Sequence, residues 1–146
     1  MILWRAARRP YADLSGKGGL HHSGRWHSEG RLIVYTAEHP ALALLEVRVN
    51  LDLPRELVPD DYVMLKIFAP EARHIQDAGA VNLRDSGESR GIGDTWLSEG
   101  KSALLRVPSA VAPESANFLI NPLHADASKI SIESAVPFTF DQRLFG

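Results

Sequence analysis

The chain has 146 residues, of which 45% are hydrophobic, and its formal net charge is −2. This length suits one domain with its own hydrophobic core, so we expect a single domain over residues 1–146. The small negative charge argues against direct binding of nucleic acid. The sequence contains no cysteine, which excludes disulfides, thiolate catalysis and cysteine-ligated zinc. The apolar run at the start is too short for a signal peptide and no segment reaches membrane-spanning length, so we expect a cytoplasmic protein without a membrane anchor.

Strands and one helix are predicted in the first half of the chain. A strand is predicted over residues 1–7 (MILWRAA), and another over 31–38 (RLIVYTAE), which is rich in β-branched and aromatic side chains. Residues 24–26 (GRW) could form the incoming strand of a hairpin that ends in the second of these strands. A helix is predicted over 41–49, because Pro40 occupies a position where a first-turn proline is tolerated and the following residues are almost wholly apolar.

The second half is predicted to contain further strands joined by polar segments. Strands are expected at 62–69, 103–107, 129–133 and 138–140, and a strand end with a turn over 72–80. Residues 81–94 are polar and glycine-rich, so we expect a loop whose part from 85 to 93 is mobile and closes over a substrate. Asp94 resembles the N-cap of a short helix over 95–99. Many short strands with few helices predict a mixed α+β domain.

Glu46 is the residue whose position most requires an explanation. At about 100° per residue, it falls beside Leu42, Leu45 and Val49, on the face of the helix that is expected to enter the core. Burial of an unpaired carboxylate is unfavourable by several kcal/mol or shifts its protonation, so a compensating partner is expected. The local pattern leaves two explanations open: a structural ion pair with Arg25, or an active site.

Ser109 follows Pro108, which cannot donate to a strand ladder and therefore ends the strand predicted at 103–107. The G-x-S-x-G sequence of a nucleophile elbow is missing around it. A hydrogen-bonding support role is therefore favoured over a nucleophilic one.

An ordered set of motifs resembles the RES-domain toxins of bacterial toxin–antitoxin operons. The matching pieces run over nearly the entire chain and are LWR, GRWHSEG, LIVYTA, ALALLE, GDTWL, LLRVPSAV, N-x-L-I-N-P-L-H and PF-x-F-D-x-R-L-F. The family takes its name from an arginine, a glutamate and a serine. By position in these motifs they are Arg25, Glu46 and Ser109, with Tyr35 as a further active-site residue. The resemblance therefore favours an active site over a structural ion pair.

The resemblance implies a fold similar to the ADP-ribosyltransferases and NAD⁺ as substrate, with no metal. It also implies a helical antitoxin with an Xre-like DNA-binding portion, which covers the active site and forms a higher-order toxin–antitoxin complex. Glu46 can stabilise the oxocarbenium-like centre that forms when nicotinamide leaves ribose. Arg25 can bind phosphate or ribose oxygens of the dinucleotide, and Tyr35 offers a ring on which nicotinamide can stack. Ser109 can bind the carboxamide or hold Glu46 in place.

The acceptor in the reaction is open at this level. Water would make the protein an NAD⁺ glycohydrolase, phosphate an NAD⁺ phosphorylase, and a side chain of a host metabolic protein a mono-ADP-ribosyltransferase. Degradation of NAD⁺ is favoured, because Leu44 stands two residues before Glu46, where many arginine-modifying transferases keep an acid or a glutamine. The alternative from another class is a non-enzymatic module that only binds a nucleotide in the same pocket.

Overall fold

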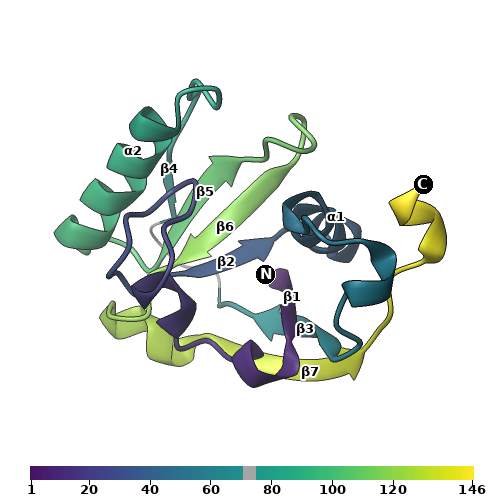
Figure 1. The fold of residues 1–146 in the computed structure, drawn as a ribbon. Helices are drawn as coiled ribbons and strands as arrows, with labels where there is room; N and C mark the ends of the chain where they lie inside the picture. Colours follow the sequence, from purple (N-terminus) through teal and green to yellow (C-terminus); the bar gives the residue numbers. More distant parts are fainter. Residues whose placement is uncertain (71–74) are drawn as a thin grey trace.

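The structure is a computed structural model that describes residues 1–70 and 75–146 (Figure 1). The described residues form two α-helices, α1 (Pro40–Asn50) and α2 (Ser86–Glu99). They also form one seven-stranded sheet, whose strands are β1 (Ile2–Arg8), β2 (Val34–Ala37), β3 (Tyr62–Phe68), β4 (Ile75–Asp77), β5 (Leu104–Pro108), β6 (Ala116–Ile120) and β7 (Ser131–Pro137). Short 3-10 helices lie at Arg9–Tyr11, Lys17–Leu20, Arg55–Leu57, Ala125–Lys129 and Gln142–Phe145. This combination confirms the predicted α+β class.

The sheet is almost divided in two between β1 and β2. The strand order is β4-β5-β6-β2-β1-β3-β7, and only β4 and β5 run parallel. β1 pairs with β3 along its whole length but with β2 only at Trp4 and Ala37. The two halves diverge from that point, and the main apolar core packs between them. Its buried members include Leu3, Leu65 and Ile67 from one half, and Leu104, Phe118 and Ile120 from the other.

The two helices flank β2. α1 packs Leu42 and Ala43 against Ala37 of β2 and against β1. α2 packs Trp96 against β5 and β6, in a cluster that Tyr35 of β2 joins from the side. Figure 1 shows α2 alongside β4 and β5, with α1 beside the end of β2. Among the described residues no helix has the length and apolar character needed to cross a membrane.

The segment predicted to be a mobile loop is helical. α2 begins at Ser86 rather than at residue 95, and Asp85 is its N-cap: the Asp85 carboxylate accepts hydrogen bonds from two backbone N–H groups of the first turn. The predicted N-cap, Asp94, lies inside the helix and accepts a hydrogen bond from the backbone N–H of Ser28. The predictions of a loop at these positions and of a separate short helix over 95–99 are therefore wrong.

The predicted hairpin is also wrong. β2 pairs with β1 and β6, and residues 24–26 form only an isolated bridge between Gly24 and His27. At the C-terminus β7 begins at Ser131, and residues 138–140 form no strand. β4 lies within the strand end predicted over 72–80, of which 72–74 are outside the described residues.

Candidate active site

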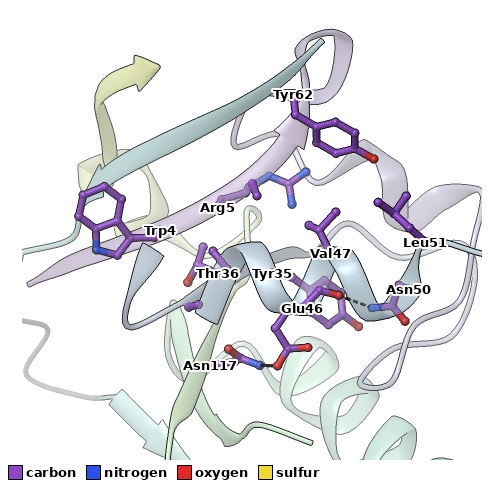
Figure 2. Close-up of a pocket in the computed structure, with 13 residues that line it drawn as sticks. Trp4, Arg5, Tyr35, Thr36, Glu46, Val47, Asn50, Leu51, Tyr62 and Asn117 are labelled. Carbon is purple, nitrogen blue, oxygen red and sulfur yellow. Dashed lines mark hydrogen bonds between the residues drawn. The ribbon is translucent and has the colours of Figure 1, made fainter. Parts of the chain in front are cut away.

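The carboxylate of Glu46 is held through one of its two oxygens. Oε1 accepts a hydrogen bond from Ser109 Oγ and another from Asn117 Nδ2, each 2.7 Å long. Figure 2 shows the contact with Asn117 of β6 beneath α1. Oε2 accepts no hydrogen bond from the part of the chain that the structure describes. Glu46 therefore has a fixed orientation and one oxygen left for a ligand.

The structural ion pair between Glu46 and Arg25 is not formed. Arg25 donates instead from Nη1 to the backbone carbonyl of Leu83, at 2.7 Å. The predicted core face of α1 is also wrong in part, because Leu45 and Val49 are 36% and 57% exposed. Glu46 thus lies at the wall of a pocket rather than in the apolar core.

Ser109 is completely buried behind Glu46. Its Oγ accepts hydrogen bonds from the backbone N–H groups of Val111 and Ala112, at 3.1 and 3.0 Å. Because a hydroxyl has a single proton, that proton is directed at Glu46. Ser109 was expected either to bind the carboxamide of NAD⁺ or to hold Glu46 in place, and this geometry matches the second role.

Two pockets meet at Glu46. One, of about 370 Å³, lies below α1 where β1 and β2 diverge, and Trp4, Tyr62 and Val47 contribute to its wall (Figure 2). The other, of about 530 Å³, lies toward α2 and is lined by two arginines, Arg25 and Arg90. The residues that line both pockets are Tyr35, Glu46, Asn50 and Asn117. A ligand that extends from one pocket into the other would therefore pass Glu46.

Tyr35 is fixed at its hydroxyl end. The hydroxyl accepts a hydrogen bond from the backbone N–H of Trp26 and lies 2.7 Å from Nδ1 of His27. His27 Nε2 lies 2.8 Å from the backbone carbonyl of His22, and a carbonyl only accepts. This assigns the proton to Nε2, so the hydroxyl of Tyr35 donates to Nδ1. Burial raises the pKa of Tyr35 and lowers the pKa of His27, which keeps both groups neutral near pH 7.

Four residues of the site were missed in the sequence: Arg5, His27, Arg90 and Asn117. Arg5 lies where β1 and β2 diverge; its Nε is buried without a hydrogen-bond partner among the described residues, and burial lowers its pKa. Asn117 Oδ1 is also buried, and it accepts no hydrogen bond from the part of the chain that the structure describes. The sequence did contain a signal for Arg5, because a charged residue within an apolar strand indicates a special role. Asn117 stands within the N-x-L-I-N motif, but no local pattern connects it with Glu46.

Comparison with known proteins identifies the class to which this fold and site belong. Residues 2–141 match the model of the RES domain. The chain is 42% identical to Toxin Res of Pseudomonas putida, over 99% of this chain and 100% of that protein. It is 36% identical to the Prs ADP-ribosylating toxin of a Sphingobium species, over 97% of this chain and 94% of that protein. The chain therefore belongs to the RES domain family, and the resemblance seen in its motifs is confirmed.

The fold is shared with a solved structure, the M. tuberculosis MbcT–MbcA toxin–antitoxin complex. The TM-score is 0.75 at 14% sequence identity, and the match covers 94% of this chain and 84% of that chain.

Proposed function

We propose that this protein is the toxin of a toxin–antitoxin pair, and that it acts in the cytoplasm by cleaving the bond between nicotinamide and ribose in NAD⁺. The observation that carries the proposal is the Glu46 carboxylate, which is fixed through Oε1 only and stands where two pockets of different character meet. The name Toxin Res of the Pseudomonas putida relative supports the toxin role.

The two pockets fit the two ends of a dinucleotide. The flat nicotinamide ring finds aromatic side chains in the first pocket, where Trp4, Tyr35 and Tyr62 contribute to the lining. The negatively charged diphosphate finds Arg25 in the second pocket. With the ends of NAD⁺ placed in this way, the nicotinamide ribose lies between them, next to Glu46.

Departure of nicotinamide leaves positive charge on the anomeric carbon and the ring oxygen of the ribose, as in glycoside cleavage. Nicotinamide is cationic in NAD⁺, so it takes the electrons of the C–N bond and leaves as a neutral molecule that needs no proton. Oε2 of Glu46 can stabilise the ribosyl cation or bind the ribose hydroxyls. Because Ser109 and Asn117 already hold the carboxylate, little reorganisation is required during the reaction.

The test is to incubate the purified protein, freed from its antitoxin, with NAD⁺ and no other protein. We expect nicotinamide to be released, and Glu46→Gln to abolish the release while the circular dichroism spectrum is unchanged, since only the charge is lost at nearly constant volume. Mass spectrometry of the second product identifies the acceptor. Free ADP-ribose indicates water, and ADP-ribose-1″-phosphate formed only in phosphate buffer indicates phosphorolysis. A folded Glu46→Gln variant that keeps most of the activity would remove Glu46 from the mechanism.

A second candidate function is transfer of ADP-ribose to a host metabolic protein. It is supported by the Sphingobium relative, which is named an ADP-ribosylating toxin. In that case NAD⁺ survives with the purified protein alone, disappears when cell extract is added, and leaves ADP-ribose on a protein. Binding of NAD⁺ without turnover under either condition indicates a nucleotide-binding module instead.

The proposed partner is an Xre-like antitoxin that covers the pocket and contributes the DNA-binding portion of the complex. The structural neighbour, which was solved as a toxin–antitoxin complex, supports an antitoxin partner for this fold.

A further inference from the structure

Arg90 brings a second guanidinium into the pocket that Arg25 lines. It projects from the first half of α2, where the sequence predicted a loop, and its side chain is half-buried. Its Nε donates to the backbone carbonyl of Gly24 at 3.3 Å. Its two terminal nitrogens donate to none of the described residues, and they are therefore available to a ligand.

Two guanidinium groups and one carboxylate, that of Glu46, line this pocket within the described residues. Neither Arg25 nor Arg90 forms a salt bridge there; each donates to a backbone carbonyl. The carboxylates of α2 and its cap do not line this pocket; Asp85 at the cap binds N–H groups of the first helical turn, and Asp94 binds Ser28 and Arg31. The two guanidinium groups form no salt bridge with the described residues and outnumber the single carboxylate, so the wall of this pocket carries net positive charge, which is typical of a site for an anion.

Both guanidinium groups are oriented before a ligand arrives. One nitrogen of each is bound to a carbonyl, Leu83 O for Arg25 and Gly24 O for Arg90. The entropy lost on binding is therefore smaller than for two freely rotating side chains. The remaining N–H groups of each fork match the oxygens of a phosphate in pairs.

We propose that Arg90 acts with Arg25 to bind the diphosphate of NAD⁺, so that Arg90 determines the preference of this enzyme for phosphate-bearing substrates. The inference rests on the proposed function. Nicotinamide riboside carries the same scissile bond and the same ribose as NAD⁺ but no phosphate. A residue that binds the diphosphate therefore contributes to cleavage of NAD⁺ and not to cleavage of the riboside.

The experiment compares wild type with Arg90→Gln in two measurements. The first is the affinity for ADP-ribose, by titration calorimetry, because ADP-ribose keeps the diphosphate and has no bond to cleave. The second is kcat/KM for NAD⁺ and for nicotinamide riboside. We expect Arg90→Gln to lower both the affinity for ADP-ribose and kcat/KM for NAD⁺ by on the order of tenfold to a hundredfold, as for the loss of hydrogen bonds to a charged group. Activity on the riboside should be unchanged.

The matched control is Arg84→Gln, which removes the same charge from an exposed position that lines neither pocket. It should leave both measurements unchanged. Arg90→Lys keeps the positive charge but not the forked guanidinium, so its affinity for ADP-ribose and its kcat/KM for NAD⁺ should fall less than those of Arg90→Gln. If Arg90→Gln does not fold, Arg90→Lys is compared with wild type in its place. Unchanged affinity for ADP-ribose in a folded Arg90 variant, or equal losses on NAD⁺ and the riboside, would overturn the inference. Failure of wild type to cleave NAD⁺ would instead overturn the proposed function, and the calorimetric arm would still decide whether Arg90 binds the diphosphate.

Discussion

The Glu46 carboxylate receives both of its hydrogen bonds on one oxygen, and both come from neutral donors. An ion pair with Arg25 would have neutralised the charge that stabilises a ribosyl cation in the proposed reaction. Neutral donors orient the carboxylate and leave its charge in place. This arrangement gives Ser109 a measurable role although it is buried away from the pocket.

Ser109→Ala should lower kcat more than it raises KM, by on the order of tenfold to a hundredfold, since Glu46 loses one of the two groups that orient it. The free energy of unfolding should also fall by about 1–3 kcal/mol, because the N–H groups of Val111 and Ala112 lose their acceptor. Steady-state kinetics and urea denaturation measure the two effects. Ser115→Ala in the same loop is the control, as the Ser115 hydroxyl bonds to none of the described residues. Wild-type kcat in Ser109→Ala would mean that Asn117 alone positions Glu46.

His27 makes the stability of the protein dependent on pH. Burial lowers its pKa from 6.5, so the unfolded chain takes up a proton at a higher pH than the folded one. The stabilisation associated with neutral His27 is therefore fully present above pH 6.5 and is lost as the pH falls through the folded value. Smaller effects of nearby Asp94, which raises the pKa, and Arg90, which lowers it, do not reverse this direction.

We expect the free energy of unfolding to decrease below pH 6.5 more steeply in wild type than in His27→Asn, which can still accept the hydrogen bond from Tyr35. Urea denaturation at a series of pH values measures the difference. Parallel curves for the two proteins would show that His27 does not titrate as its burial requires.

Among the residues of the site, helix periodicity identified Glu46 as exceptional, and the family resemblance offered Ser109 as a group that could hold it, but nothing in the sequence pointed to Asn117. The periodicity of the helix showed that Glu46 was out of place among apolar residues. Its partners, Ser109 and Asn117, lie 63 and 71 positions further along the chain. Contacts between such distant segments leave no local pattern, and the partner that local reasoning proposed, Arg25, lies elsewhere on the pocket wall.

Among the elements, α1 and α2 differ in what makes them helical. α1 contains the strong local signals, a first-turn proline followed by apolar residues of good helix propensity, and it was predicted. α2 contains three glycines and few apolar residues, so its local propensity is poor. Its stability comes from Asp85 at the N-cap and from tertiary contacts such as the hydrogen bond from Ser89 Oγ to the carbonyl of Arg25. Tertiary stabilisation of this kind cannot be read from a window of sequence.

Two glycines of α2 should respond in opposite ways to the same substitution. A Cβ at Gly93 would overlap the backbone carbonyl of Trp26, next to Arg25, whereas a Cβ at Gly91 would meet nothing. Gly91→Ala should therefore stabilise the protein by up to about 1 kcal/mol through helix propensity. Gly93→Ala should destabilise it and lower activity, because α2 and the 24–27 segment must separate.

Thermal unfolding and NAD⁺ turnover of the two variants provide the measurement. Hydrogen exchange adds a direct check on the helix itself, since amides in the middle of α2 should be protected in the free protein. Fast exchange there, together with equal tolerance of alanine at Gly91 and Gly93, would restore the mobile loop that the sequence favoured.

In the molecule as a whole, the site lies where the sheet divides, and the C-terminus supports the helix above it. Arg48 of α1 donates from Nε to the backbone carbonyl of Leu144 at 2.9 Å, and its guanidinium lies 4.1 Å from the centre of the Phe145 ring. α1 is thus held by β1 and β2 below and by the end of the chain at its side. Because β1 and β2 diverge after one paired position, the pocket next to Glu46 forms without any distortion of either strand.

The face of the molecule that carries the pocket is also the expected binding surface for the antitoxin. An enzyme that destroys NAD⁺ would harm the cell that makes it, so we expect the cognate partner to inhibit by covering the pocket. The pocket wall carries Arg25 and Arg90, which form no salt bridge with the described residues, and the exposed side chain of Val49 adjoins them. A helical antitoxin segment with an acidic side chain near Arg25 would complement this surface.

The measurement is NAD⁺ turnover by the free protein and by the purified complex. The complex should be inactive, and NAD⁺ or ADP-ribose should compete with antitoxin binding, because both occupy the same pocket. Arg25→Gln should weaken the complex and reduce its sensitivity to salt, since an ion pair near the surface is screened as ionic strength rises. A complex that retains full NAD⁺ turnover would show that the antitoxin binds elsewhere on the molecule.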